Sequence, residues 1–264
     1  MIWILCLIII FIIIVIIILY TRTYPLVMKE HHLYDPYVYY KNVYNFNTSL
    51  YKTTRFIICR YNENPLFLNY IPEEFEVWVY NKGSNFRHDR KNLKIIKQDN
   101  IGFETYTYLK YMIDNFENLA DTNVFIQASF LNSYKFVKFN QILSQLYKGN
   151  DKFFYAGSSY YHTKQDVLDF YINSYCLTSN NKNCKIKLSD YRPLQKWLQH
   201  YFPEITTIDI YNIGYNSFLI IPKQNIQKVG LPMLQRLVSF YTEPGVQNEE
   251  IHYMERLWAT FFNE

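Results

Sequence analysis

Two apolar segments rich in β-branched and aromatic residues are each followed by polar side chains of a kind that binds ligands. Arg60 ends the segment 55–60, and Tyr61, Asn62 and Glu63 follow it. After the segment 75–80 come Lys82 and Gly83. Doubly wound α/β proteins bind their ligands beyond the carboxyl ends of the strands. We therefore predict that these six residues bind ligand. The alternative for each group is a turn of solvated polar side chains.

A carboxylate and an amide occupy two further positions of this kind. Gln127 follows the apolar residues 124–126, and Glu104 lies in the first turn of a helix that opens at Gly102. The positive end of the helix dipole favours a carboxylate there. We predict that Glu104 is catalytic and that Gln127 binds ligand. Both are expected in one polar cleft with the end of the first strand.

Carboxylate and imidazole groups also gather near the C-terminus. His252, Glu255 and Arg256 fall within two turns of an expected helix, so several of them share one face. Such groups exchange protons or bind a divalent metal. We predict catalytic roles for His252 and Glu255 and ligand binding by Arg256, and a metal stays an open question. The alternative is an ion-paired amphipathic helix whose core stripe is Ile251, Met254, Leu257 and Trp258.

Several well-known motifs are absent from the sequence. It contains no Gly-x-Gly-x-x-Gly, no P-loop, no Gly-x-Ser-x-Gly and no His-Glu-x-x-His. This excludes the easily recognised dinucleotide, phosphate-loop, hydrolase and zinc-protease sites. The residues identify no cofactor.

After residue 54 the chain contains short apolar segments, typical of strands, and segments with helical periodicity. Strands are expected at 55–60, 75–80, 93–96, 123–128, 153–157 and 217–221. Helices are expected at 103–116, 135–147, 189–201, 226–241 and 249–262. This order predicts one α/β domain over 55–264, with a mixed, mainly parallel sheet flanked by helices.

The N-terminal segment contains an unbroken apolar run at 2–19. Such a run comes close to the ~20 residues that a helix needs to cross a bilayer. We predict a single-pass membrane protein with an anchor at 1–21 and a stalk at 22–54. A cleavable signal peptide is the alternative, although the segment lacks a basic start, a short apolar core and a small-residue cleavage site.

The side of the membrane on which the domain lies stays open. Arg22 and Lys29 follow the apolar run and favour the cytoplasm. The glycosylation sequon at Asn47 favours the lumen. A disulfide between Cys176 and Cys184 belongs to an oxidising lumen, and this pairing stays open as well.

The formal net charge of +4 is spread along the chain. Proteins that follow nucleic-acid phosphates concentrate Lys and Arg on one face or helix. No nucleic-acid partner is therefore predicted. The densest basic run, 87–91, is expected to be a solvated loop.

The sequence resembles the domain-of-unknown-function 3431 family. The segments that carry the resemblance most specifically are 100–104, 107–116 and 124–127. Shorter motifs of the family occur in the same order at 60–63, 80–83 and 255–258, so the resemblance extends over about 56–262. The family is itself distantly similar to glycosyltransferase-A folds. The resemblance therefore implies a glycosyltransferase-A-like fold.

Two departures from the family pattern concern the expected site. Phe103 stands where relatives often carry Arg, and Ala128 and Ser129 follow Gln127 where relatives often have glycine and further polar groups. Glycosyltransferases of this fold normally carry an Asp-x-Asp pair after the fourth strand, which holds a metal and the sugar diphosphate. No such pair follows here. Metal-dependent catalysis is thereby placed in doubt.

Two functions are compatible with these observations. The first is a membrane-anchored, glycosyltransferase-like enzyme that acts on glycans or sugar conjugates. It would contact lipid through its N-terminal helix and a nucleotide sugar or glycan through the predicted site. The second is a non-catalytic domain that binds a glycan or a protein or serves a structural role, and the missing Asp-x-Asp pair favours it.

Overall fold

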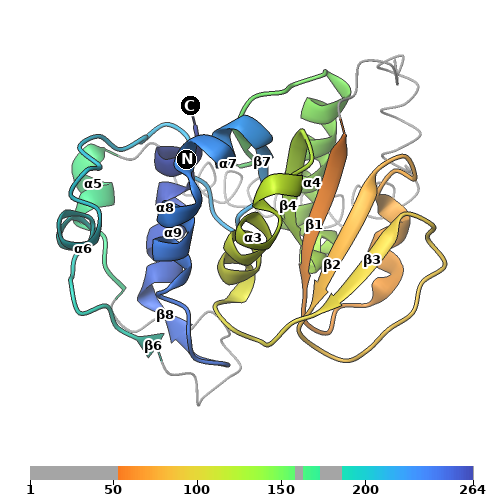
Figure 1. Cartoon of the computed structure of the whole chain (residues 1–264), viewed down its shortest axis with the longest axis horizontal. Helices are drawn as coiled ribbons and strands as arrows, with labels where there is room; N and C mark the ends of the chain where they lie inside the picture. Colours follow the sequence, from red (N-terminus) through yellow and green to blue (C-terminus); the bar gives the residue numbers. More distant parts are fainter. Residues whose placement is uncertain (1–52, 158–162, 173–185, 264) are drawn as a thin grey trace, which may run out of the picture. The chain divides into compact units, whose positions relative to one another are not determined.

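A mixed six-stranded sheet lies at the centre of the part of the chain that the computed structural model describes, residues 53–157, 163–172 and 186–263 (Figure 1). Its strands, in spatial order, are β3 (Leu93–Lys97), β2 (Glu76–Asn81), β1 (Thr54–Arg60), β4 (Thr122–Gln127), β7 (Leu219–Pro222) and β5 (Phe154–Tyr155). The first four run parallel, and β7 runs antiparallel to both of its neighbours. A second, two-stranded sheet pairs β6 (Ile186–Lys187) with β8 (Gln247–Asn248).

Helices lie on both sides of the large sheet. The α-helices are α3 (Phe103–Asp114), α4 (Ser133–Tyr147), α5 (Lys164–Leu168), α6 (Leu194–Tyr201), α7 (Lys223–Val229), α8 (Leu231–Val238) and α9 (Glu249–Phe262). Short 3-10 helices are η2 (Pro65–Tyr70), η3 (Phe116–Asn118) and η4 (Ala128–Leu131). Figure 1 shows α3 in front of the sheet and α4 behind it. Because helices cover both faces, the central strands β1 and β4 consist mainly of buried apolar side chains.

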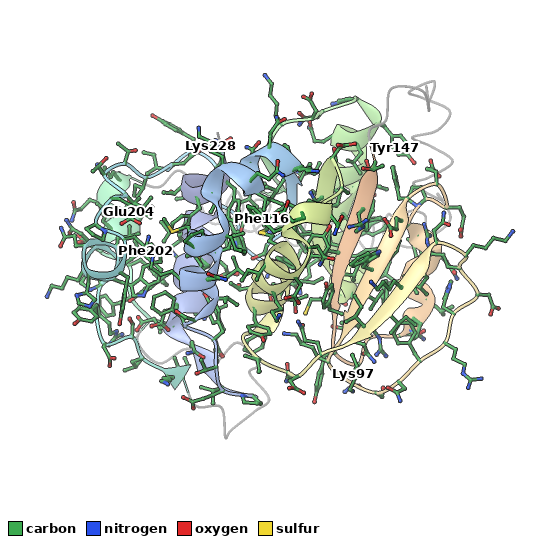
Figure 2. The ribbon with its side chains drawn as sticks, in the orientation of Figure 1. Lys97, Phe116, Tyr147, Phe202, Glu204 and Lys228 are labelled. Carbon is green, nitrogen blue, oxygen red and sulfur yellow. The ribbon has the colours of Figure 1, made fainter. Side chains whose placement is uncertain are left out.

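Aromatic side chains fill much of the core between the sheet and the C-terminal helices (Figure 2). Trp258 of α9 packs against Tyr108 of α3, which packs in turn against Phe125 of β4. Trp197 of α6 is fully buried. Burial of such large side chains is the main contribution that holds α3 and α9 against the sheet and α6 against α9.

The predicted α/β architecture with a mainly parallel sheet and flanking helices is confirmed. The expected helix at 226–241 is wrong in one respect, because the structure has two helices there, α7 and α8. Gly230 separates them with a φ of +80°, and Pro232 follows in the first turn of α8. The expected helix at 189–201 begins only at Leu194, after Pro193. Helix α5 was not expected.

The expectation of a solvated basic loop at 87–91 is wrong for Arg90. Its side chain is buried. The guanidinium donates hydrogen bonds of 2.5–3.4 Å to four backbone carbonyl oxygens, those of Leu68, Ile71, Pro72 and Phe75. Arg90 therefore holds the connection between η2 and β2 in place.

The predicted membrane anchor and stalk, the sequon at Asn47 and the two cysteines Cys176 and Cys184 lie outside the described residues. Within the ranges that the structure describes, no helix is both long and apolar enough to span a bilayer.

Candidate functional site

The carboxyl ends of the parallel strands meet at one edge of the sheet, where β1 lies between β2 and β4. Arg60 at the end of β1 is level with Asn81 of β2, and Cys59 is level with Gln127 of β4. The antiparallel strand β7 begins at this same edge, because Leu219 pairs with Phe125 near the end of β4. Crevices between strands that connect in opposite directions are where doubly wound sheets bind ligands.

Glu104 and Gln127 contact each other at this edge. Gly102 and Phe103 have positive φ values of +53° and +49°, and Phe103 is the first residue of α3. Glu104 therefore lies in the first turn of the helix, and its Oε1 accepts a 2.8 Å hydrogen bond from Nε2 of Gln127. The carboxylate and amide that the sequence suggested as partners are thus brought together.

Asn216 links this pair to the C-terminal helix. Its carbonyl oxygen accepts a 2.9 Å hydrogen bond from Gln127 Nε2, and its backbone N–H donates a 3.1 Å bond to Oε1 of Glu255. The other oxygen of Glu255 lies 3.3 Å from Nδ1 of His252. Glu104, Gln127, Asn216, Glu255 and His252 thus form one continuous chain of hydrogen bonds, here called the polar network.

Two lysines of α4 approach the polar network, and sequence reasoning missed both. Lys135 Nζ donates to Oε1 of Gln127 at 2.5 Å and to Oγ of Ser129 at 2.8 Å. Lys138 Nζ donates to the carbonyl oxygen of Tyr215 at 2.5 Å and lies 3.3 Å from Oδ1 of Asn216. The available signal was their i, i+3 spacing at the start of the helix that follows β4, which places both on one helical face.

Burial shifts the proton affinity of several of these groups. It raises the pKa of Glu104 above its ordinary value, and the nearby Glu255 carboxylate raises it further. Burial lowers the pKa of Lys135, and it lowers the pKa of Lys138 to about 8. Titratable groups with shifted pKa values at the ligand-binding edge of a sheet are typical of acid–base sites.

Strained backbone borders the polar network on two sides. Among the described residues, Phe103, Asn216 and Ser217 are the non-glycine residues with positive φ. Phe103 precedes Glu104, and Asn216 belongs to the network itself. The indole Nε1 of Trp258 holds the second turn through a 3.1 Å hydrogen bond to Ser217 Oγ. Such conformations are costly and cluster where function requires a fixed geometry.

Two of the predicted ligand-binding cations are engaged with the protein backbone. Arg60 is buried and donates to the carbonyl oxygens of Glu63 and Ser84 at 2.8 Å each and to Oδ1 of Asn81 at 2.6 Å. Lys82 is buried and donates to the carbonyl oxygen of Ile101 at 2.6 Å and also to that of Phe103. These contacts hold the loops around the site and the start of α3.

The remaining predicted residues of the loops after β1 and β2 lie at the same edge of the sheet. Asn62 Oδ1 accepts from the N–H of Ser84, and Glu63 Oε2 accepts from the N–H of Tyr61. Tyr61 is half exposed. Gly83 passes so close to Tyr61 that a Cβ there would lie 1.6 Å from the Tyr61 carbonyl oxygen.

The Arg256 guanidinium contacts aromatic rings and the backbone of α9. It stacks on the ring of Phe170, 3.3 Å from the ring centre, and Nη1 donates to the carbonyl oxygen of His252 at 2.8 Å. It also lies over the ring of Tyr215 at 5.3 Å. These contacts hold the Arg256 side chain against α9 and against the rings of Phe170 and Tyr215.

The side chains after β4 do not suit a divalent metal. Gln127 and Ser129 offer an amide and a hydroxyl oxygen in place of two carboxylates, and the ammonium of Lys135 already lies between them. Magnesium, manganese and calcium sites are built mainly from carboxylate oxygens. In the part of the chain that the structure describes, no three His, Cys, Asp or Glu side chains are grouped so as to hold a metal ion.

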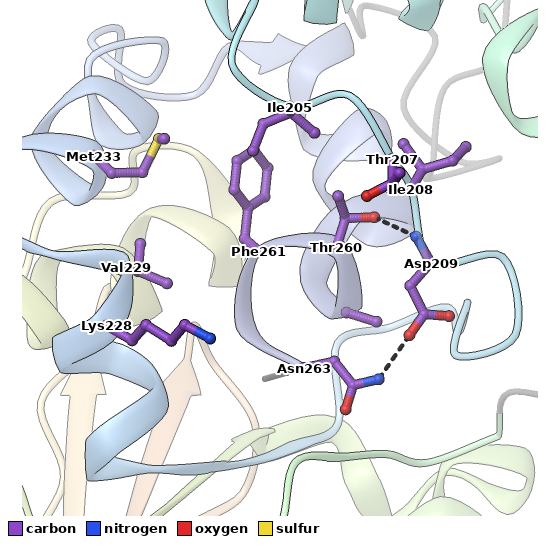
Figure 3. A pocket seen from close by; sticks show the side chains of 11 residues that line it. Ile205, Thr207, Ile208, Asp209, Lys228, Val229, Met233, Thr260, Phe261 and Asn263 are labelled. Carbon is purple, nitrogen blue, oxygen red and sulfur yellow. Dashed lines mark hydrogen bonds between the residues drawn. The ribbon is translucent and has the colours of Figure 1, made fainter.

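A cavity of about 480 Å³ lies elsewhere, between the segment 205–209, α7, α8 and the end of α9 (Figure 3). Asp209 lies on its wall and accepts a 2.7 Å hydrogen bond from Nδ2 of Asn263. Three further hydrogen bonds, from the N–H groups of Tyr211 and Asn212 and from the Asn212 side chain, lower the pKa of Asp209. No residue of the polar network lines this cavity.

No curated protein matches the chain. One family model does match, over residues 62–137, and its family is described as "Protein of unknown function (DUF3431)". The matched segment begins directly after β1 and ends in α4. It therefore contains Glu104, Gln127 and Lys135 but neither β7 nor α9. The resemblance to the DUF3431 family that the sequence predicts is therefore confirmed over residues 62–137.

Proposed function

We propose that this protein is a membrane-anchored, glycosyltransferase-like enzyme that transfers a sugar from a nucleotide sugar to a glycan or another sugar conjugate. The observation that carries the proposal is the polar network, which joins Glu104, at the start of α3, to Glu255 and His252 of α9 across the carboxyl end of β4. Helices α3 and α9, which lie far apart in the sequence, thus supply groups to one place at the end of β4.

The sheet supports a nucleotide-containing substrate. The order β3-β2-β1-β4 matches the first four strands of the doubly wound order 3-2-1-4-5-6, which binds dinucleotides. In such sheets the nucleotide lies in the crevice beyond the point where the strand order reverses. Here that point is between β1 and β4. A glycosyltransferase-A-like fold is our reading of this sheet together with the antiparallel strand β7.

The network offers groups for each part of a sugar transfer. The acceptor hydroxyl must lose its proton while its oxygen bonds to the sugar C1, and the bond from C1 to the phosphate oxygen breaks to release a nucleoside diphosphate. We assign Glu255 as the base that takes this proton, with His252 as the positioning residue 3.3 Å away. Glu104, with its raised pKa, is the second catalytic carboxyl group.

The predicted N-terminal helix completes the proposal. The uncharged run at 2–19 would hold the domain at a lipid surface, next to membrane-bound or lipid-linked acceptors. Lipid is then the permanent partner, and the nucleotide sugar is the transient one.

A non-catalytic role in binding a glycan or a protein is the second candidate, and one observation favours it. Arg60 and Lys82 have their donors directed at protein carbonyl groups, as is typical of structural polar contacts. Under this alternative the polar network stabilises the junction of α3, β4 and α9 and touches no substrate.

Thermal unfolding of the full-length chain in detergent, with a panel of nucleotide sugars, separates the two candidates. The enzyme predicts that at least one nucleotide sugar raises the melting temperature, because a ligand that binds only the folded state stabilises it. Glu104→Gln and Glu255→Gln should keep the unliganded melting temperature. No shift with any nucleotide sugar, together with a large loss of stability in both variants, would favour the structural role.

A further inference from the structure

We propose that the ammonium of Lys135 takes the place of a divalent metal ion in binding the diphosphate of the nucleotide sugar, so that donor binding needs no metal. This inference rests on the proposed function, because it concerns the same site. It names the group that neutralises the diphosphate.

The positions of Gln127 and Ser129 carry the argument. They follow β4 at i and i+2, the place and spacing at which an Asp-x-Asp pair would hold a metal. Their side-chain oxygens both accept from Lys135 Nζ, at 2.5 Å and 2.8 Å. The two oxygens that would face a metal ion therefore face an ammonium.

A divalent cation is disfavoured at this point by charge as well as by ligand type. Gln127 and Ser129 carry no negative charge, so they bind a hard cation weakly in comparison with carboxylates. Lys135 would also repel such an ion at short range.

Lys135 retains the capacity to bind a phosphate oxygen. An ammonium group has three N–H donors, and two of those of Lys135 are used by Gln127 and Ser129. Among the described residues the third donor has no acceptor and can point at a ligand, and the side chain is only partly buried. Lys135 is also the third residue of α4, where the positive end of the helix dipole adds to its charge.

Lys138 provides a second positive charge one turn further along α4. Its two acceptors within the described part of the chain, the Tyr215 carbonyl oxygen and Asn216 Oδ1, likewise leave one N–H donor. The two ammonium groups match the charge of a diphosphate, which has oxygens on two neighbouring phosphorus atoms. Burial lowers the pKa of Lys135, and the nearby Glu104 carboxylate opposes this shift and favours the charged ammonium.

Isothermal titration of the full-length chain in detergent tests this inference, with inorganic pyrophosphate and uridine diphosphate as probes. Each probe is titrated once with EDTA and once with Mn²⁺. We expect equal affinity in both solutions. Lys135→Met should weaken binding at least tenfold, and Lys135→Arg should retain most of it because the cation is kept. Lys148→Met, at the exposed end of α4, is the matched control and should bind as the wild type does.

The outcomes separate this inference from the proposed function. Binding that appears only with Mn²⁺, or that survives unchanged in Lys135→Met, overturns the role of Lys135 and leaves the enzyme proposal standing. An absence of binding in both solutions, for both probes and for the nucleotide sugars, overturns the two together. Melting curves of each variant confirm that the lost affinity does not come from unfolding.

Discussion

Glu104, which we propose is catalytic, lies in an environment that disfavours its negative charge. It accepts a hydrogen bond from Gln127, yet burial and the Glu255 carboxylate raise its pKa. The folded protein therefore binds a proton at Glu104 more tightly than the unfolded chain does. As the pH rises above the ordinary value of 4.5, the unfolded chain ionises first, and the stability of the folded state falls until the raised pKa is passed.

Replacing Glu104 by Gln should remove this loss of stability with rising pH. At pH 7 the free energy of unfolding of Glu104→Gln is expected to equal or exceed that of the wild type, because Gln keeps an acceptor for Gln127 and carries no charge. Below pH 4 the free energies of unfolding of the two proteins should become equal, because Glu104 is then protonated in both the folded and the unfolded state. Sugar transfer should decrease by roughly 10²- to 10⁴-fold. Urea unfolding at a series of pH values measures the effect on stability. The stability of the variant minus that of the wild type should increase from pH 4 to pH 7, and a decrease would contradict the prediction.

The structural role of Arg90 could not be predicted from the sequence. It sits in a basic run, yet its guanidinium satisfies buried backbone carbonyl groups around η2. Arg90→Met should destabilise the domain by roughly 3 kcal/mol, because these carbonyl groups lose a charged donor and no water replaces it. Arg87→Met, at an exposed position of the same run, is the control and should leave thermal unfolding unchanged. Equal melting temperatures for the two variants would show that the Arg90 contacts contribute little.

Sequence periodicity identified most elements because each has a local signal. The segment 249–262 matches α9, and the apolar runs at 55–60 and 123–128 match β1 and β4 to within a residue. The i, i+3 pair His252 and Glu255 could be placed on one helical face for the same reason. Asn216, however, has no signal, because its role depends on an irregular turn before the antiparallel strand β7.

Two further errors have identifiable physical causes. The periodic pattern at 226–241 continues across Gly230, and only its φ of +80° shows that the chain turns there and starts a new helix. Lys135 and Lys138 resemble solvated lysines of an amphipathic helix. Their contacts arise only because η4 directs the start of α4 back toward the end of β4, which is a tertiary effect.

Helix α9 is fixed at its N-terminus by Glu249, which is fully buried. Its two oxygens accept from the N–H groups of Ile172 and Ser189 at 2.8 Å and 3.0 Å, and Arg192 Nε lies 2.8 Å from Oε2. Glu249→Ala should cost roughly 3–5 kcal/mol, because it leaves buried donors and a cation without their partner. Chemical denaturation measures this. Glu243→Ala, in an exposed pair with Lys187, should unfold like wild type, and an equally mild effect at Glu249 would contradict the account.

At the scale of the whole molecule, the proposal places a membrane anchor at the apolar run 2–19. The full-length chain should stay with membranes during extraction with alkaline carbonate, because only the loss of a spanning helix would free it. A chain that lacks residues 1–21 should move to the soluble fraction. Release of the full-length chain, or a mature N-terminus beyond Tyr20, would show that the segment is not an anchor.

The most direct test of the account is whether Glu255 is required for sugar transfer. The full-length chain in detergent is incubated with the nucleotide sugar that stabilises it, and release of the nucleoside diphosphate is followed over time. We predict release by the wild type, at least a 100-fold lower rate for Glu255→Gln with an unchanged melting temperature, and a normal rate for Glu117→Gln, an exposed control. No release from any nucleotide sugar, or an undiminished rate in Glu255→Gln, would contradict the assignment of the polar network as an active site.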